Sequence, residues 1–167
     1  MELEIKVKPP MPKKLKLIGR REHVDFPELG LHALEAKIDT GAYTSALHCH
    51  DIEVRNQGGT PVLYFFLLDP LHPEYSQQQH CFTEFTKKTI KSSVGEAEER
   101  YVIKTLIRLG GKLIRTSISL TDRGGMRYPV LIGRKMIRNK FIIDVKQLHL
   151  GGLALSKAFP YLSNTKN

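Results

Sequence analysis

A carboxylate stands at the end of a predicted strand in Ala36-Lys37-Ile38-Asp39-Thr40-Gly41-Ala42. Residues 31–38 have the pattern of a strand, and Gly41 permits the sharp backbone turn that must follow it. Asp and Gly are also ordinary turn residues, so a capped turn that leaves a β-strand is the simpler interpretation of this pattern alone. The pattern therefore places Asp39 at a strand end without deciding its role.

A second motif lies near the other end of the chain, in Tyr128-Pro129-Val130-Leu131-Ile132-Gly133-Arg134. It runs a hydrophobic strand into a glycine and then into a short helical pattern. Together the two motifs resemble the retropepsin-like aspartic proteases, and more closely the bacterial RimK-linked retropepsin-like family, which is often labelled as ATP-dependent zinc proteases. Thr44-Ser45-Ala46-Leu47-His48 and Asp122-Arg123 contribute to the resemblance, which covers residues 15–147.

The resemblance implies an aspartic-type peptidase or amidase with Asp39 as the catalytic acid. Thr40 would lie inside the loop, partly buried, and brace it. Gly41 and Ala42 would contact the main chain of the substrate, and Arg134 would also lie at the substrate-binding site. This chemistry needs two carboxylates that share one proton. Retropepsins take the second carboxylate from the same motif of a two-fold related subunit, so we expect a homodimer.

The partner of Arg134 and the source of the second carboxylate are left open by the sequence. Retroviral enzymes carry an Asp four residues after the catalytic one, where it pairs with the Arg of the late motif, and here that position is Tyr43. Asp122, Asp144 or an acidic substrate could take the charge of Arg134 instead. Asp122 is also the candidate second carboxylate if the protein works as a monomer, although a glycine-rich turn at 122–125 is the simpler interpretation.

Residues 92–99 are the predicted flap. They lie between the strand-like runs 81–91 and 100–109, where retropepsins carry a mobile hairpin over the substrate, and their Gly and small polar residues suit mobility. The three glutamates of this segment would repel an acidic substrate. Either the substrate is not acidic, or these side chains point away from the cleft.

The charge of the chain favours an anionic partner. There are 26 Lys and Arg against 17 Asp and Glu, a formal net charge of +9. Nucleic acid is left open as a partner, but no nucleic-acid-binding motif accompanies the scattered basic residues. RimK-type ATP-grasp ligases add glutamates to the C-terminus of a ribosomal protein, and the resemblance suggests a peptidase that trims such a tail. The alternative is a non-catalytic barrel module that binds acidic peptide or RNA.

The sequence predicts neither a metal site nor a nucleotide site. His48 and His50 have the spacing that puts both imidazoles on one strand face, but zinc needs three or four ligands, and two histidines on a solvated face are the simpler interpretation. No Gly-x-x-x-x-Gly-Lys-Ser/Thr loop occurs, so any ATP requirement would belong to a partner. Cys49 and Cys81 are expected to be free thiols. Without a signal-peptide pattern or a run of about 18 apolar residues, a cytoplasmic protein with no membrane contact is expected.

Length and pattern predict one domain. At 167 residues and 41% hydrophobic, the chain fits one core. We expect a mainly β, acid-protease (retropepsin-like) closed β-barrel of about six to eight strands over residues 15–150. One short C-terminal helix is expected at 134–139, packed under the Asp39 loop, with residues 152–159 as a second candidate helix. Residues 1–14 predict an extended arm, and residues 151–167 predict a C-terminal tail.

Overall fold

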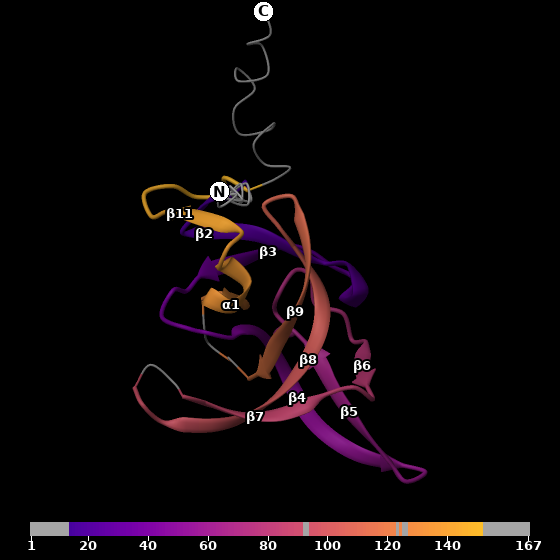
Figure 1. Cartoon of the computed structure of the whole chain (residues 1–167). Helices are drawn as coiled ribbons and strands as arrows, with labels where there is room; N and C mark the ends of the chain where they lie inside the picture. Colours follow the sequence, from indigo (N-terminus) through magenta and orange to yellow (C-terminus); the bar gives the residue numbers. More distant parts are fainter. Residues whose placement is uncertain (1–13, 92–93, 123, 125–126, 152–167) are drawn as a thin grey trace, which may run out of the picture.

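The computed structural model describes residues 14–91, 94–122, 124 and 127–151. The predicted arm, the second candidate helix and the tail therefore lie almost entirely outside the described residues. The part of the chain that is described contains eleven strands, one 3-10 turn and one α-helix, shown in Figure 1. Their bounds are β1 (Lys16–Gly19), β2 (Arg21–Phe26), η1 (Pro27–Leu29), β3 (Leu31–Ile38), β4 (Ser45–Gln57), β5 (Thr60–Leu67), β6 (Gln79–Phe82), β7 (Thr86–Lys91), β8 (Ala97–Leu109), β9 (Lys112–Thr121), β10 (Val130–Ile132), α1 (Arg134–Ile137) and β11 (Phe141–Asp144).

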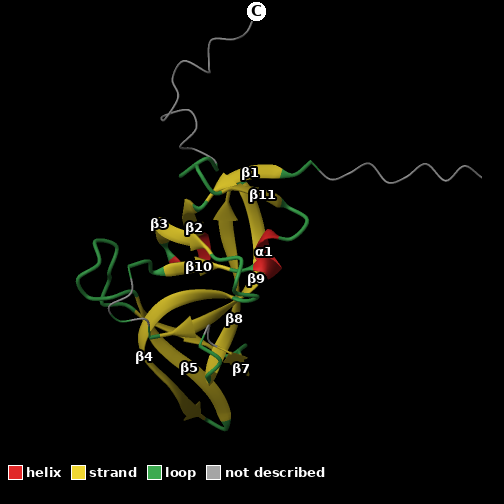
Figure 2. Ribbon diagram, turned by 90° about the vertical axis from the view of Figure 1, so that its left-hand side faces the viewer, coloured by secondary structure: helices red, strands yellow, loops and turns green. Residues whose placement is uncertain are grey.

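Six of these strands pair into a closed ring in the order β10-β3-β2-β8-β9-β4, because β4 also pairs with β10. β5 and β6 extend the sheet beyond β4, and β7 pairs with the outer part of β8. β1 and β11 form a separate parallel pair. Figure 2 shows this pair at one end of the molecule and β4, β5 and β7 at the other. The predicted mainly β fold with one short helix is confirmed.

The core follows from the two-residue period of the strands. In β8, Ile103, Ile107 and Leu109 are buried while Lys104 and Arg108 are exposed, so one face of the strand lies inside the ring. Other strands contribute in the same way. The largest side chains that are fully buried include Phe26, Leu34, Leu47, Leu63, Phe65, Ile118 and Leu120.

β10 lies between the two strands that flank the Asp39 loop. Val130 pairs with Ala36 of β3 in parallel and with Leu47 of β4 in an antiparallel arrangement. Both edges of β10 are therefore hydrogen-bonded within the ring, and Val130 and Ile132 are fully buried. The late motif and the Asp39 motif are therefore parts of one substructure.

The helix α1 begins directly after β10 and packs against the Asp39 loop, as predicted. The amides of Arg134 and Lys135 donate to the carbonyl oxygens of Ala42 and Tyr43 at 2.8 and 3.0 Å. Gly133 is required at this junction, because a Cβ there would lie 2.7 Å from the carbonyl oxygen of Tyr43. The glycine of the late motif thus permits the close approach of two backbone segments.

The predicted strand at 81–91 is wrong as a single element. Its first part belongs to β6, which pairs with β5, and its second part is β7, which pairs with β8. The chain crosses between the two partners at residues 83–85, where Phe85 packs edge-on against Tyr101 at a ring separation of 5.8 Å. Alternation along the sequence predicts an extended chain, but it does not say that the partner strand changes partway.

None of the described helices is long and apolar enough to span a membrane.

Candidate active site

Asp39 lies in the loop between β3 and β4, as predicted, and its side chain is half-buried. Its amide donates to the carbonyl oxygen of Ile132 at 2.9 Å, which fixes the loop to β10. Its Oδ1 accepts the amide of Gly41 at 3.0 Å, and the amide of Ala42 closes the turn on the Asp39 carbonyl oxygen at 3.3 Å. These hydrogen bonds hold the carboxylate in one place on the loop.

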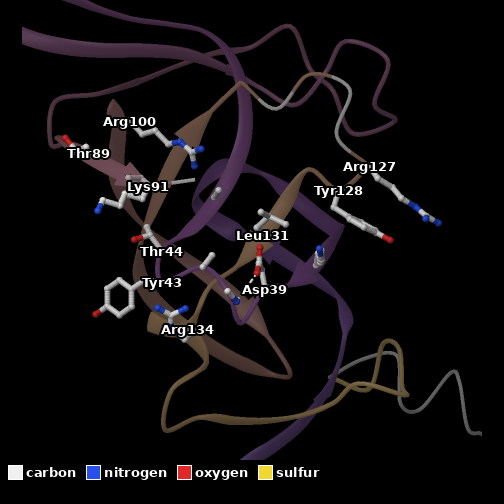
Figure 3. A pocket seen from close by; sticks show the side chains of 15 residues that line it. Asp39, Tyr43, Thr44, Thr89, Lys91, Arg100, Arg127, Tyr128, Leu131 and Arg134 are labelled. Atoms are coloured by element: carbon white, nitrogen blue, oxygen red, sulfur yellow. Dashed lines mark hydrogen bonds between the residues drawn. The ribbon is translucent and has the colours of Figure 1, made fainter. Parts of the chain in front are cut away.

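A pocket of about 880 Å³ opens beside this carboxylate (Figure 3). Asp39 is the one acidic residue among the described residues that line it. Five basic residues line it as well, so the pocket is strongly positive around a single carboxylate. The lining residues are Lys37, Asp39, Gly41, Ala42, Tyr43, Thr44, Ala46, Thr89, Ile90, Lys91, Arg100, Arg127, Tyr128, Leu131 and Arg134.

The hairpin of β7 and β8 forms one side of the pocket. Figure 3 shows Thr89, Lys91 and Arg100 on that side, with Tyr43 and Arg134 from the Asp39 loop and α1 below them. The segment predicted as the flap is the connection of this hairpin, and residues 92–93 of it lie outside the described part. That the hairpin moves over a substrate stays a prediction.

Two of the three glutamates of that segment are held by basic side chains of the same hairpin. Glu98 pairs with Arg100 at 2.8 Å, and Glu99 pairs with Lys87 at 2.9 Å. Neither glutamate is among the residues that line the pocket. Repulsion of an acidic substrate by these side chains is therefore reduced, and the pocket presents Lys91 and Arg100 instead.

Arg134 supports the Asp39 loop through a backbone carbonyl. Its Nη1 donates to the carbonyl oxygen of Thr40 at 2.8 Å, and its guanidinium carbon lies 5.9 Å from the centroid of the Tyr43 ring. Tyr43 thus places an aromatic ring near the guanidinium where retroviral enzymes have a carboxylate. Within residues 14–151 as described, Arg134 forms no ion pair, so neither Asp122 nor Asp144 takes its charge.

Thr40 does not lie where we expected. It is exposed, because it occupies the outer side of the turn that the Asp39–Ala42 hydrogen bond closes. Within the single chain, Thr40 uses its carbonyl oxygen, and not a buried hydroxyl, to connect the loop to Arg134. The expectation that Thr40 lies inside and partly buried is therefore wrong.

Asp122 is not brought together with Asp39. It follows β9, its side chain is 69% exposed, and it is not among the residues that line the pocket. Its Oδ1 accepts the amide of Gly124 at 2.9 Å, which is the turn that glycine-rich sequence favours. The same oxygen lies 4.0 Å from Nδ1 of His48.

The interpretation of His48 and His50 as residues on a solvated strand face is wrong. The side chain of His48 is only 7% exposed, and Nδ1 of His50 lies 2.8 Å from the carbonyl oxygen of Leu68. The reason is that β4 pairs with β5, β9 and β10, so this part of the strand lies in the middle of the sheet. Burial lowers the pKa of His48, and the charge of Asp122 opposes this.

Sequence reasoning did not find the basic pocket or a second group of polar side chains. Lys37, Lys91, Arg100 and Arg127 come from four separate segments, and only the fold brings them to one pocket. The second group is His23, Glu35 and His149, whose possible ligand atoms all lie within 4.8 Å of one another. Knowledge of the antiparallel register of β2 and β3 would have paired His23 with Glu35. No sequence pattern indicates that His149 joins them.

Comparison with known proteins gives consistent matches. Residues 17–150 match the family model described as RimB-like, retropepsin-like aspartic endopeptidase RimB. Similar curated proteins are named probable alpha-L-glutamate ligase: one from Shewanella pealeana is 37% identical over 132 residues, and one from Desulfotalea psychrophila is 34% identical over 130. Each alignment covers 77% of this chain and 28% of the relative, so the chain spans less than a third of their length. A crystal structure of a Legionella pneumophila protein of unknown function is similar with a TM-score of 0.59 and 25% identity, over 82% of this chain and 98% of that one.

Proposed function

The chain belongs to the family of RimB-like, retropepsin-like aspartic endopeptidases, and from that premise we propose that it is an aspartic-type peptidase with Asp39 as its catalytic carboxylate. The observation that carries the proposal is the position of Asp39 in a fixed loop beside a pocket of about 880 Å³. Gly41 and Ala42, in the same loop, also line this pocket, and they are the residues we propose to lie along the main chain of a substrate.

The reaction needs a second carboxylate, and we place it on Asp39 of a second copy of the chain. One carboxylate of such a pair is ionised and takes a proton from a water molecule as the water oxygen bonds to the scissile carbonyl carbon. The other gives its proton to the carbonyl oxygen. The C–N bond of the resulting tetrahedral intermediate then breaks as the pair gives a proton to the departing amine nitrogen. The pair takes a proton back from one hydroxyl of the intermediate, which leaves a carboxylic acid and restores the singly protonated pair. Asp122 does not supply it within one chain, because it is not among the residues that line the pocket of Asp39.

The substrate we propose is an acidic peptide. Five basic residues line the same pocket as Asp39: Lys37, Lys91, Arg100, Arg127 and Arg134. Among the described residues, only Arg100 of these five has a carboxylate partner. Cationic side chains without carboxylate partners favour the carboxylates of a glutamate-rich chain. The proposed substrate is therefore a peptide that ends in several glutamates.

The names of the relatives support a link to glutamate ligation. A region similar to this chain makes up 28% of proteins named probable alpha-L-glutamate ligase, so the same polypeptide also carries a much longer remainder. A peptidase that trims glutamate tails and a ligase that builds them would act on the same acidic chain. We therefore propose an ATP-grasp glutamate ligase as the functional partner of this protein.

The second candidate function is a non-catalytic module that holds an acidic peptide or RNA. The observation that favours it is the single carboxylate in a pocket otherwise lined by basic and neutral residues. Such a pocket would bind an anionic chain even with no second carboxylate present. Binding alone would also suit a region attached to a ligase.

The test compares cleavage and binding in the full chain. A peptide ending in several glutamates is incubated with the wild-type chain, with Asp39→Asn and with the matched control Asp51→Asn, an exposed residue away from the pocket. Mass spectrometry follows the peptide, and fluorescence anisotropy follows its binding. Cleavage that Asp39→Asn abolishes while binding persists supports the peptidase. Binding without cleavage by the wild type, or equal cleavage by Asp39→Asn, would refute it.

A further inference from the structure

Three side chains with metal-binding atoms converge at the outer face of the β2–β3 hairpin. His149 Nε2 lies 2.9 Å from Glu35 Oε2, and His23 Nε2 lies 3.2 Å from the same oxygen. All three ligand atoms fall within 4.8 Å of one another. We propose that His23, Glu35 and His149 form a binding site for a divalent transition-metal ion of the Zn²⁺ type, separate from the Asp39 pocket.

The fold places two of the ligands by strand register. His23 of β2 and Glu35 of β3 are directly paired in the antiparallel ladder, so their side chains lie on the same face of the hairpin. The hairpin is part of the closed ring, and it therefore gives these two side chains a fixed base. This matches the requirement that metal ligands come from rigid elements.

The third ligand is delivered by the segment that follows β11. The amide of His149 donates to the carbonyl oxygen of Arg21 at 2.9 Å, beside the hairpin. The next two amides, of Leu150 and Gly151, donate to the fully buried carboxylate of Glu22 at 2.8 and 3.0 Å. His149 also has a left-handed backbone conformation (φ 52°), which few residues with a side chain adopt. These backbone hydrogen bonds hold the loop residue His149 beside the hairpin, so its imidazole lies next to Glu35.

The spacing of the donor atoms is close to that of a zinc site. Zinc binds imidazole nitrogen and carboxylate oxygen at about 2.0 to 2.2 Å, so the ligand atoms of a tetrahedral site lie about 3.3 to 3.5 Å apart. The two contacts to Glu35 Oε2 are 2.9 and 3.2 Å, so expansion by a few tenths of an ångström makes room for the ion. The group is half-exposed, which leaves the fourth position open to water.

Binding requires one rearrangement. The rings of His23 and His149 are stacked with centroids 4.1 Å apart and planes at 9°, so the lone pairs of the two Nε2 atoms run parallel and do not converge. The side chain of His23 is 44% exposed, so a rotation of its ring away from the stack would direct its Nε2 at an ion beside Glu35 Oε2. Arg21 lies 3.6 Å from the other oxygen, Oε1, and so leaves Oε2 for the ion.

The donor set determines the class of ion. Two imidazoles and one carboxylate suit Zn²⁺ and its neighbours in the first transition row, whereas Ca²⁺ and Mg²⁺ prefer oxygen ligands alone. None of the three residues lines the Asp39 pocket, so the proposed ion is structural. It would tie the segment around His149 to the hairpin that leads to Asp39.

The test measures metal binding directly and does not use peptidase activity. The full chain without a histidine tag is stripped with a chelator and titrated with Zn²⁺ by calorimetry, and with Co²⁺ by visible absorption. We expect one Zn²⁺ per chain and a tetrahedral Co²⁺ spectrum. The variants His149→Gln, Glu35→Gln and His23→Gln should each weaken binding by about tenfold or more. The control is His32→Gln, an exposed histidine on the same strand as Glu35, and it should bind as the wild type does.

Circular dichroism checks that each variant is folded. His23→Gln serves as the decisive variant if the others unfold, because its side chain lies on the exposed edge of the cluster and its backbone pairing is unchanged. The proposal is overturned if the wild type takes up no Zn²⁺ at micromolar concentration. It is equally overturned if folded His23→Gln and His32→Gln bind the ion with the same affinity as the wild type.

Discussion

Arg134 and Thr40 are joined by a hydrogen bond of 2.8 Å from the guanidinium Nη1 to the backbone carbonyl oxygen, although 94 positions separate them in the chain. The contact joins the late motif to the Asp39 motif, because a charged side chain of one donates to a backbone carbonyl of the other. The Tyr43 ring lies beside the guanidinium. A backbone acceptor on the loop is independent of the side chain at position 40. The Arg134 side chain therefore adds one contact to the backbone hydrogen bonds that hold the Asp39 loop.

Arg134→Lys should lower the kcat/KM for a glutamate-ended peptide about tenfold or more. Lysine keeps the charge, but it loses the planar donor group that reaches the Thr40 carbonyl oxygen and the Tyr43 ring. The contact is exposed, so the free energy of unfolding should change by less than about 1 kcal/mol. Peptide cleavage kinetics and urea unfolding measure the two effects. Arg127→Lys, in the same pocket, is the control, and an equal loss in both variants would contradict this role.

Lys91→Gln should raise the KM for an acidic peptide about threefold or more. This increase in KM should be smaller at high salt. Lys91 lines the pocket on the hairpin side and has no ion-pair partner among the described residues. Salt screens the attraction between exposed charges that lie farther apart than the Debye length, which is about 10 Å at 0.1 M salt and about 3 Å at 1 M. Lys88→Gln is the matched control, because it removes the same charge from the same strand at a position outside the pocket lining. Equal effects would mean that net charge alone attracts the substrate.

Glu22→Gln should destabilise the fold. The carboxylate of Glu22 is fully buried and accepts three backbone amides, from Gly19 at 2.6 Å, Leu150 at 2.8 Å and Gly151 at 3.0 Å. The side-chain amide of glutamine has one oxygen, which can still accept the amides of Gly19 and Leu150, but its NH₂ group then faces the N–H donor of Gly151. A loss of about 2 to 4 kcal/mol in the free energy of unfolding is expected. Urea unfolding measures it, with exposed Glu84→Gln as control, and a loss below about 1 kcal/mol would contradict the contact.

Stability should fall as the pH drops below about 6.5, in part because of His48. Burial lowers the pKa of His48 in the folded state below its ordinary value of 6.5, so the unfolded chain binds more protons in that range. The contribution of neutral His48 is complete above pH 6.5 and is lost as the pH falls toward the folded pKa. Asp122→Asn removes a charge that raises this pKa, so the midpoint should move lower still. NMR titration of the His48 ring in the wild type and in Asp122→Asn measures this midpoint, and a higher midpoint in the variant would contradict the prediction.

The sequence predicted the parts of the fold that local pattern determines. Residues 31–38 alternate, and Asp39 and Gly41 end the strand with turn chemistry, so the loop was foreseeable. The late motif was also readable, because a hydrophobic run that ends in Gly133 continues into a helix. The resemblance then joined two motifs that are far apart in the chain.

Long-range contacts were the part that local pattern did not determine. The change of partner strand between β6 and β7 depends on packing such as Phe85 against Tyr101, which alternation does not encode. Burial of His48 depends on the neighbours that β4 acquires in the sheet. His149 reaches Glu35 across 114 positions through backbone contacts that no motif marks.

A mixing experiment should decide whether the second carboxylate comes from another chain. The described pocket holds one carboxylate, whereas the proposed reaction needs two carboxylates that share a proton. A fixed amount of wild-type chain, above the dimer dissociation constant, is mixed with increasing Asp39→Asn chain, and peptide cleavage is followed. If sites are shared and assembly is random, cleavage should fall to about half at an equal ratio and to about a quarter at threefold excess, since mixed dimers hold only one Asp39. Asp51→Asn at the same ratios is the control and should not reduce cleavage. Cleavage that stays constant as Asp39→Asn is added would show that each chain works alone, and it would refute the shared site.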